Sequence, residues 1–108
     1  VLVTGSIDYY LKPVMADLGI DHLLCTRLEQ DTQGMLTGRS LGPVCVGDIK
    51  VDLARVLSRE QEIDLQQSYG YGNSELDIPL LKLVGNPVVV NPTQGLETFA
   101  TLENWSTL

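Results

Sequence analysis

The amino-acid sequence predicts an α/β fold in which helices flank a Rossmann-like parallel sheet. Two observations predict it: short apolar runs alternate with longer stretches of helical periodicity, and glycine or proline closes most of these segments. Strands that alternate with helices of this length pair in parallel, because each helix carries the chain back to the start of the next strand. The 108 residues contain no repeat and no linker, so a single domain over residues 1–108 is expected.

The first half of the chain is expected to form two strands, two helices and a hairpin. The apolar run Val1–Thr4, closed by Gly5, and the run Leu23–Cys25 suit buried strands. Between them, Ser6 is expected to cap a helix that ends at Gly19. A short hairpin, or an excursion over the active face, is expected at Gly34–Gly38, and a helix is expected at Asp48–Glu60.

The second half is expected to form two strands, each followed by a helix. The strands are Gln67–Tyr71 and Val88–Val90, of which the second is a run of three valines that Asn91 and Pro92 end. One helix starts at Ser74, and the last helix runs from Leu96 to Trp105. Apolar residues at helical spacing are expected on the inner faces of these two helices, namely Leu76, Leu80, Leu83 and Val84 in the first and Leu96, Phe99 and Ala100 in the second.

The composition excludes some partners and favours others. A net charge of −7 argues against nucleic acid, since Lys and Arg drive binding to a phosphate backbone. A small phosphorylated metabolite is compatible with this charge, because one or two cations suffice locally. No apolar run reaches the roughly 18 residues that a membrane span needs. Cys25 and Cys45 have apolar neighbours and are expected to be small buried residues; a disulfide is the alternative. Buried free thiols favour a cytoplasmic protein.

Two segments carry residues that suit phosphate binding. Thr4, Gly5 and Ser6 follow the first strand, and small residues at such a turn leave hydroxyl and backbone N–H groups free to bind a phosphate. A simple helix cap at Ser6 is the alternative. Lys50 lies in the first turn of a helix, where the helix dipole disfavours a cation. It is expected either to reach an anion at the site or to be a solvated surface lysine.

A third segment suits a divalent cation. Asn73 and Asp77 follow the strand that Gly72 closes, and their side-chain oxygens are ligands that Mg²⁺ accepts. Ser74 and Asp77 also have the spacing of a capping box, which requires no metal. The residues alone leave both interpretations open.

Taken together and in this order, these segments resemble the second, third and fourth motifs of the haloacid dehalogenase-like hydrolases. Within that superfamily the chain is similar to the phosphoserine phosphatase branch, and the resemblance extends from end to end. The matching segments are Val3–Ser6, Thr26–Leu28 with Leu36–Gly38, Gly47–Lys50, Tyr71–Asp77, Val89–Pro92 and Leu102–Trp105.

The resemblance implies a phosphatase that hydrolyses a small phosphate monoester, such as phosphoserine, through an aspartyl-phosphate. It implies that Thr4 and Lys50 hold the phosphoryl oxygens and offset the charge of the transferring group. Asn73 and Asp77 would complete a Mg²⁺ site together with the nucleophile. The implied fold is the core of this superfamily without its first strand, which bears the nucleophile.

Two departures from the family pattern change these expectations. No Asp-x-Asp segment occurs in the sequence, so the chain alone has no nucleophile, and it opens directly in a strand-like run that suggests a cut end. Asn73 stands where the family usually has Asp, which removes a charge from the metal site. The expected partner is an upstream segment, or another copy of the chain, that fills the gap between the strands Val1–Thr4 and Gln67–Tyr71. The alternative function is a degenerate, non-catalytic binding or regulatory module.

Overall fold

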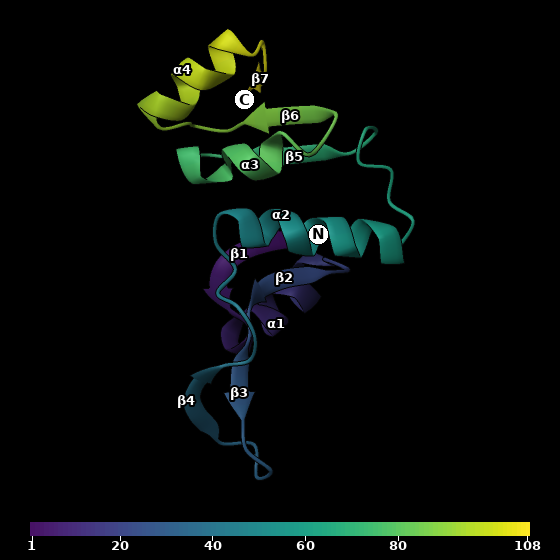
Figure 1. Ribbon diagram of the computed structural model, residues 1–108, viewed down its shortest axis with the longest axis vertical. Helices are drawn as coiled ribbons and strands as arrows, with labels where there is room; N and C mark the ends of the chain where they lie inside the picture. The colour runs from purple at the N-terminus through teal and green to yellow at the C-terminus, as the bar shows by residue number, and fades with distance from the viewer. The chain divides into compact units, whose positions relative to one another are not determined.

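The computed structural model describes residues 1–108, which divide into two compact units, Val1–Lys50 and Val51–Leu108. Each unit contains parallel strands with flanking helices, so the predicted α/β fold class is confirmed (Figure 1). No helix is both long enough and apolar enough to cross a membrane.

The first unit is built on two parallel strands joined by a helix. Strand β1 (Leu2–Ile7) pairs with β2 (Leu23–Thr26), and α1 (Asp8–Leu18) connects them and packs against both. Gly19 ends α1 in the left-handed conformation, with φ 65°, as the sequence predicts. This crossover brings the carboxyl ends of β1 and β2 to the same edge of the pair.

The predicted helix cap at Ser6 is wrong. Ser6 lies inside β1, the N-cap position is Ile7, and no side chain caps α1. The Ser6 N–H instead donates to the Thr4 hydroxyl oxygen at 3.1 Å, and the β1–β2 register is irregular between Val3 and Ile7. Residues 4–6 therefore continue β1, and the helix starts at Asp8, later than expected.

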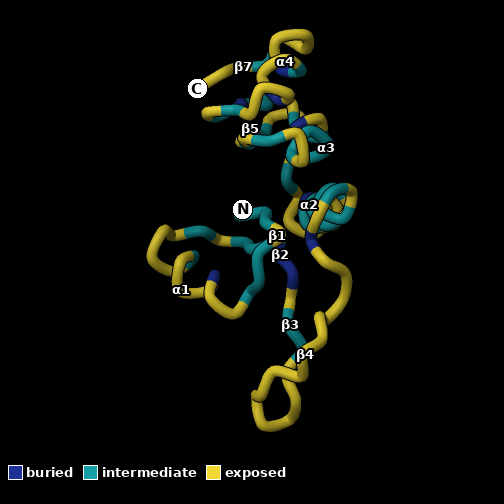
Figure 2. Tube along the Cα trace, turned by 90° about the vertical axis from the view of Figure 1, so that its left-hand side faces the viewer, coloured by how far each residue is buried: buried dark blue, intermediate teal, exposed yellow.

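The predicted hairpin is confirmed and is longer than expected. Strands β3 (Leu28–Gln30) and β4 (Leu36–Ser40) pair antiparallel. Asp31 shapes their connection by accepting the N–H groups of Gln33 and Met35, each at 2.9 Å. Every residue of β4 is exposed, as the yellow tube of this segment in Figure 2 shows.

Helix α2 (Asp48–Glu60) has the bounds that the sequence predicts. Gly47 precedes it with φ 52°, a backbone conformation that suits glycine. The first turn places Lys50 as the third residue of the helix.

The second unit contains a three-stranded parallel sheet in the order β5-β6-β7. Its strands are β5 (Tyr69–Gly72), β6 (Asn86–Val89) and the two-residue β7 (Ser106–Thr107), which is too short to be recognised from a sequence pattern. The helical segments are the 3₁₀ turn η1 (Glu75–Asp77), α3 (Ile78–Leu81) and α4 (Gln94–Leu102). Within this unit α3 contacts β5 and α4 contacts β6 (Figure 1).

The core of the second unit is formed by one residue of α3, one of β6 and two of α4. These residues are Leu81, Val89, Leu96 and Ala100, with Ile78 and Trp105 packed against them. Phe99 and Trp105 meet edge to face with ring centroids 5.2 Å apart. The predicted burial of Leu96 and Ala100 is therefore confirmed.

The predicted helix from Ser74 starts later than expected, and one of its four predicted inner residues is exposed. A 3₁₀ turn occupies Glu75–Asp77, and the α-helix starts at Ile78 with Pro79 in its first turn. Proline favours a first-turn position, so the helical register is set there and not at Ser74. As a result Leu76, predicted to face inward, is 73% exposed, and Leu81 is fully buried instead.

Candidate active-site residues

The predicted site residues fall into two groups. Thr4, Gly5, Ser6 and Lys50 belong to the first unit, whereas Asn73 and Asp77 belong to the second. Thr4, Gly5 and Ser6 lie in the second half of β1, Lys50 lies in the first turn of α2, and Asn73 and Asp77 follow the carboxyl end of β5. This is the edge at which α/β sheets form their ligand sites.

In the first unit, the segment that leads into α2 lies directly against residues 4–6 of β1. A Cβ added to Gly5 would lie 3.2 Å from Val46 Cγ1 and 3.4 Å from the Cys45 carbonyl oxygen. Any side chain at this position would therefore press on the neighbouring segment. Glycine at position 5 therefore allows this close approach without displacement of Val46.

Cys45 links the two predicted phosphate-binding residues. Its thiol is fully buried, and burial raises its pKa, while the nearby Lys50 ammonium and a bond from the Thr4 N–H lower that pKa. Thr4 and Lys50, which are 46 positions apart, therefore belong to two segments that meet at Cys45. Burial of Cys45 was predicted, but the sequence carries no signal for its place between these residues. Cys25 is also buried, and both thiols are free, as predicted.

In the second unit, the Asp77 carboxylate organises the turn that carries Asn73. Its Oδ2 accepts the Asn73 N–H at 3.1 Å and the Ser74 N–H at 3.3 Å. Ser74 and Asp77 form a capping box, so the capping role left open by the sequence is real. A Cβ on Gly72 would lie 2.7 Å from the Asp77 Cβ, so glycine makes room for this carboxylate.

Glu75 anchors the same turn and has no role in the sequence-based prediction. Its Oε2 accepts the Thr93 hydroxyl at 2.6 Å, and the Thr93 N–H donates to the Asn73 carbonyl at 2.9 Å. The hydroxyl bond is the main reason why the pKa of Glu75 is lowered, and the Gly95 N–H contributes in the same direction. Glu75 thereby joins the Asn73 turn to the start of α4, a contact over 18 positions that no local pattern encodes.

A magnesium ion would find only part of its coordination sphere in this chain. Mg²⁺ takes six oxygen ligands, several of them water. Asn73 and Asp77 supply two oxygen-bearing side chains, and one Asp77 oxygen is already shared with two N–H groups. No group of three His, Cys, Asp or Glu residues is placed to hold a metal. The residues present do not by themselves form a complete magnesium site.

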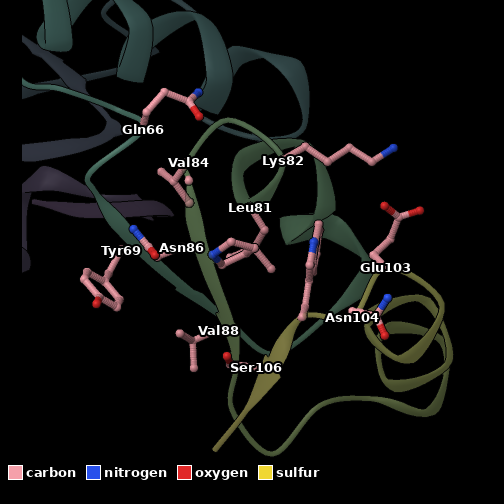
Figure 3. Close-up of a pocket in the computed structure, with 13 residues that line it drawn as sticks. Gln66, Tyr69, Leu81, Lys82, Val84, Asn86, Val88, Glu103, Asn104 and Ser106 are labelled. Carbon is pink, nitrogen blue, oxygen red and sulfur yellow. The ribbon is translucent and has the colours of Figure 1, made fainter.

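A hollow in the second unit lies elsewhere. It has a volume of about 640 Å³ and is lined by Gln66, Tyr69, Asn86, Asn104 and other residues of the second unit (Figure 3). These residues stand at the amino ends of β5, β6 and β7. Asn73 follows the opposite, carboxyl end of β5, so this hollow is separate from the predicted site.

Comparisons with known proteins agree with this α/β architecture. A family model described as haloacid dehalogenase-like hydrolase matches residues 1–82. A histidinol-phosphatase from Neisseria meningitidis is 31% identical over 110 residues, which cover 99% of this chain and 50% of that protein. A phosphoserine phosphatase from Mycobacterium tuberculosis is 32% identical over 104 residues, which cover 96% of this chain and 33% of that protein.

One solved structure is similar over nearly the whole chain. It is a protein of unknown function from Bordetella pertussis Tohama I, with a TM-score of 0.89 and 30% identity, and the match covers 99% of this chain and 49% of that one. The chain therefore belongs to the haloacid dehalogenase-like hydrolase family. Within this family it is phosphoserine phosphatase-like, which confirms the resemblance inferred from the motifs. It spans about half or less of the length of these relatives.

Proposed function

We propose that this chain forms the phosphate-binding and metal-side part of a magnesium-dependent phosphatase that hydrolyses a small phosphate monoester of the phosphoserine type. The observation that carries the proposal is the close approach of the Thr4–Ser6 segment to the segment that leads from Cys45 to Lys50, which the Thr26 hydroxyl joins through the Gly5 carbonyl and the Cys45 N–H. A hydroxyl and an ammonium group on the same edge of a parallel sheet are suited to a phosphate dianion. The relatives named phosphoserine phosphatase and histidinol-phosphatase support this substrate class. The two free, buried cysteines suit a cytoplasmic protein.

In the proposed reaction the side chains of this protein offset the charge of the phosphoryl group and hold it in position. Lys50 offsets the negative charge that develops on the phosphoryl oxygens, and Thr4 donates a hydrogen bond to one of them. Asn73 and Asp77 would hold part of the coordination sphere of a Mg²⁺ ion, which would supply positive charge beside the phosphoryl oxygens. The phosphoryl group is taken by an aspartate of an Asp-x-Asp strand, a segment that these 108 residues do not contain. That nucleophile is proposed to come from another segment or chain.

Titration of the chain with inorganic phosphate, with and without Mg²⁺, tests this function. Replacement of Lys50 with methionine is expected to weaken binding at least about tenfold, because a hydrogen bond to a charged group contributes about 1.5–3 kcal/mol. Lys12→Met is the matched control, since Lys12 is an exposed lysine of the same unit in α1. Equal losses in the two variants, or a wild-type chain that binds no phosphate, would contradict the proposal.

The same titration separates the enzyme from a non-catalytic binding or regulatory module. The neutral side chain of Asn73 and the engaged Asp77 carboxylate favour that second function. For a metal site, Asn73→Asp should tighten Mg²⁺ binding about tenfold, since affinity rises with the number of charged ligands. Phosphate binding that is indifferent to Mg²⁺ in both wild type and Asn73→Asp would favour the module.

The proposed macromolecular partner is a strand-bearing segment that supplies the nucleophile, or a second copy of this chain. β1 pairs only with β2, and β5 pairs only with β6, so each unit has a sheet edge without a strand. Tyr69 and Tyr71 of β5 are 66% and 62% exposed, and unpaired edges readily bind other strands. Light scattering on the isolated chain is expected to show self-association. A monomer with one cooperative unfolding transition at micromolar concentration would count against this.

A further inference from the structure

Thr26 connects the two phosphate-binding segments of the first unit through its side chain. It is the last residue of β2 and is 6% exposed. Its hydroxyl donates to the Gly5 carbonyl oxygen at 3.0 Å and accepts the Cys45 N–H at 3.0 Å. The donor and one acceptor site of this hydroxyl are therefore both used, and both partners are backbone groups.

The two backbone groups that Thr26 bonds belong to the segments that carry the proposed phosphate ligands. Gly5 directly follows Thr4, and Cys45 stands five positions before Lys50. Between Cys45 and Lys50 the chain makes only a short turn, in which the Ile49 N–H donates to the Val46 carbonyl at 3.1 Å. The hydroxyl thus lies at the point where the first strand, the second strand and the start of α2 meet.

Packing alone does not account for a threonine at this position. Valine has the same shape and would fill the same space, but it would leave the buried Cys45 N–H without the bond that the hydroxyl supplies. A hydroxyl at the end of a strand, bonded to the backbone of two other segments, determines how far apart those segments lie.

We propose that Thr26 is a positioning residue, which sets the spacing between the Thr4 hydroxyl and the Lys50 ammonium group and thereby the affinity of the site for a phosphate group. This inference rests on the proposed phosphate-binding function of Thr4 and Lys50. Thr26 does not touch the ligand. It acts through the Gly5 carbonyl and the Cys45 N–H, which hold the two ligand-bearing segments.

The experiment compares wild type with Thr26→Val, which removes the hydroxyl, and Thr26→Ser, which keeps it. Inorganic phosphate is titrated at a temperature where thermal unfolding curves show that each protein is folded. Thr26→Val is expected to weaken phosphate binding at least about tenfold and to speed amide exchange at Cys45, whereas Thr26→Ser stays within about threefold of wild type. Rescue by serine is the readout that a role in packing alone would not produce, since serine packs less well than valine.

The outcomes separate this inference from the function on which it rests. If Lys50→Met weakens phosphate binding but Thr26→Val does not, Thr26 is not a positioning residue and the proposed function stands. If the wild-type chain binds no phosphate, both are overturned. If Thr26→Val does not fold, the test rests on Thr26→Ser alone. This variant keeps the hydroxyl, so a loss of phosphate affinity of about tenfold would contradict the proposal.

Discussion

Replacement of Gly85 with alanine is expected to lower the free energy of unfolding of the second unit by about 3 kcal/mol. The Gly85 N–H donates to the Leu65 carbonyl at 2.9 Å, which holds this residue against the backbone of the preceding loop. An added Cβ would overlap the carbonyl oxygen of Gln66. Because the obstacle is backbone, the turn between α3 and β6 would have to move, and with it the start of β6.

Gly70→Ala is the matched control for this substitution. A Cβ at Gly70 would meet the side chain of Val84 at 2.9 Å, and a side chain can shift more easily than a peptide group. We expect a loss of about 1 kcal/mol, clearly smaller than that at Gly85. Chemical denaturation of both variants measures the two values. Equal losses would show that the Gly85 turn moves freely and that its contact with Gln66 is unimportant.

Truncation of Leu81 to alanine is expected to cost about 3–5 kcal/mol. Leu81 is fully buried and belongs to the cluster that joins α3, β6 and α4. Its loss would leave a cavity bordered by Val89 and Leu96, in a unit with few other buried apolar side chains. We expect a large drop in the denaturation midpoint and early loss of the Trp105 fluorescence signal, since Trp105 packs on this cluster.

Leu76→Ala controls for the chemical change itself. Leu76 lies five positions earlier but is 73% exposed, so its truncation should change stability by no more than about 0.5 kcal/mol. A similar loss at both positions would mean that Leu76 is also covered, either by another copy of the chain or by a partner. The pair of substitutions therefore tests the helix phase that the structure assigns to this segment.

The amino-acid sequence by itself determined the order and type of most elements. Helix α2 has its predicted bounds, and α1 ends at the predicted glycine. Short-range physics suffices for these features, because helical periodicity, a left-handed glycine and apolar runs act over a few residues. The motifs also predicted the family. Each motif is a short segment, such as Lys50 in the first turn of a helix or Asp77 after the strand that Gly72 ends, and can be recognised without the tertiary structure.

Only the tertiary structure decided which residues those local features bring together. The start of α3 depends on Pro79 and on the core around Leu81. Local spacing carries no information about that core, and it therefore predicted that Leu76 would be buried. The meeting of Thr4 with Cys45, and the bonds of Thr26 and Glu75, join segments 18 or more positions apart. Such contacts form because parallel strands bring their carboxyl ends to the same edge of a sheet. No pattern in the intervening sequence predicts which residues will meet there.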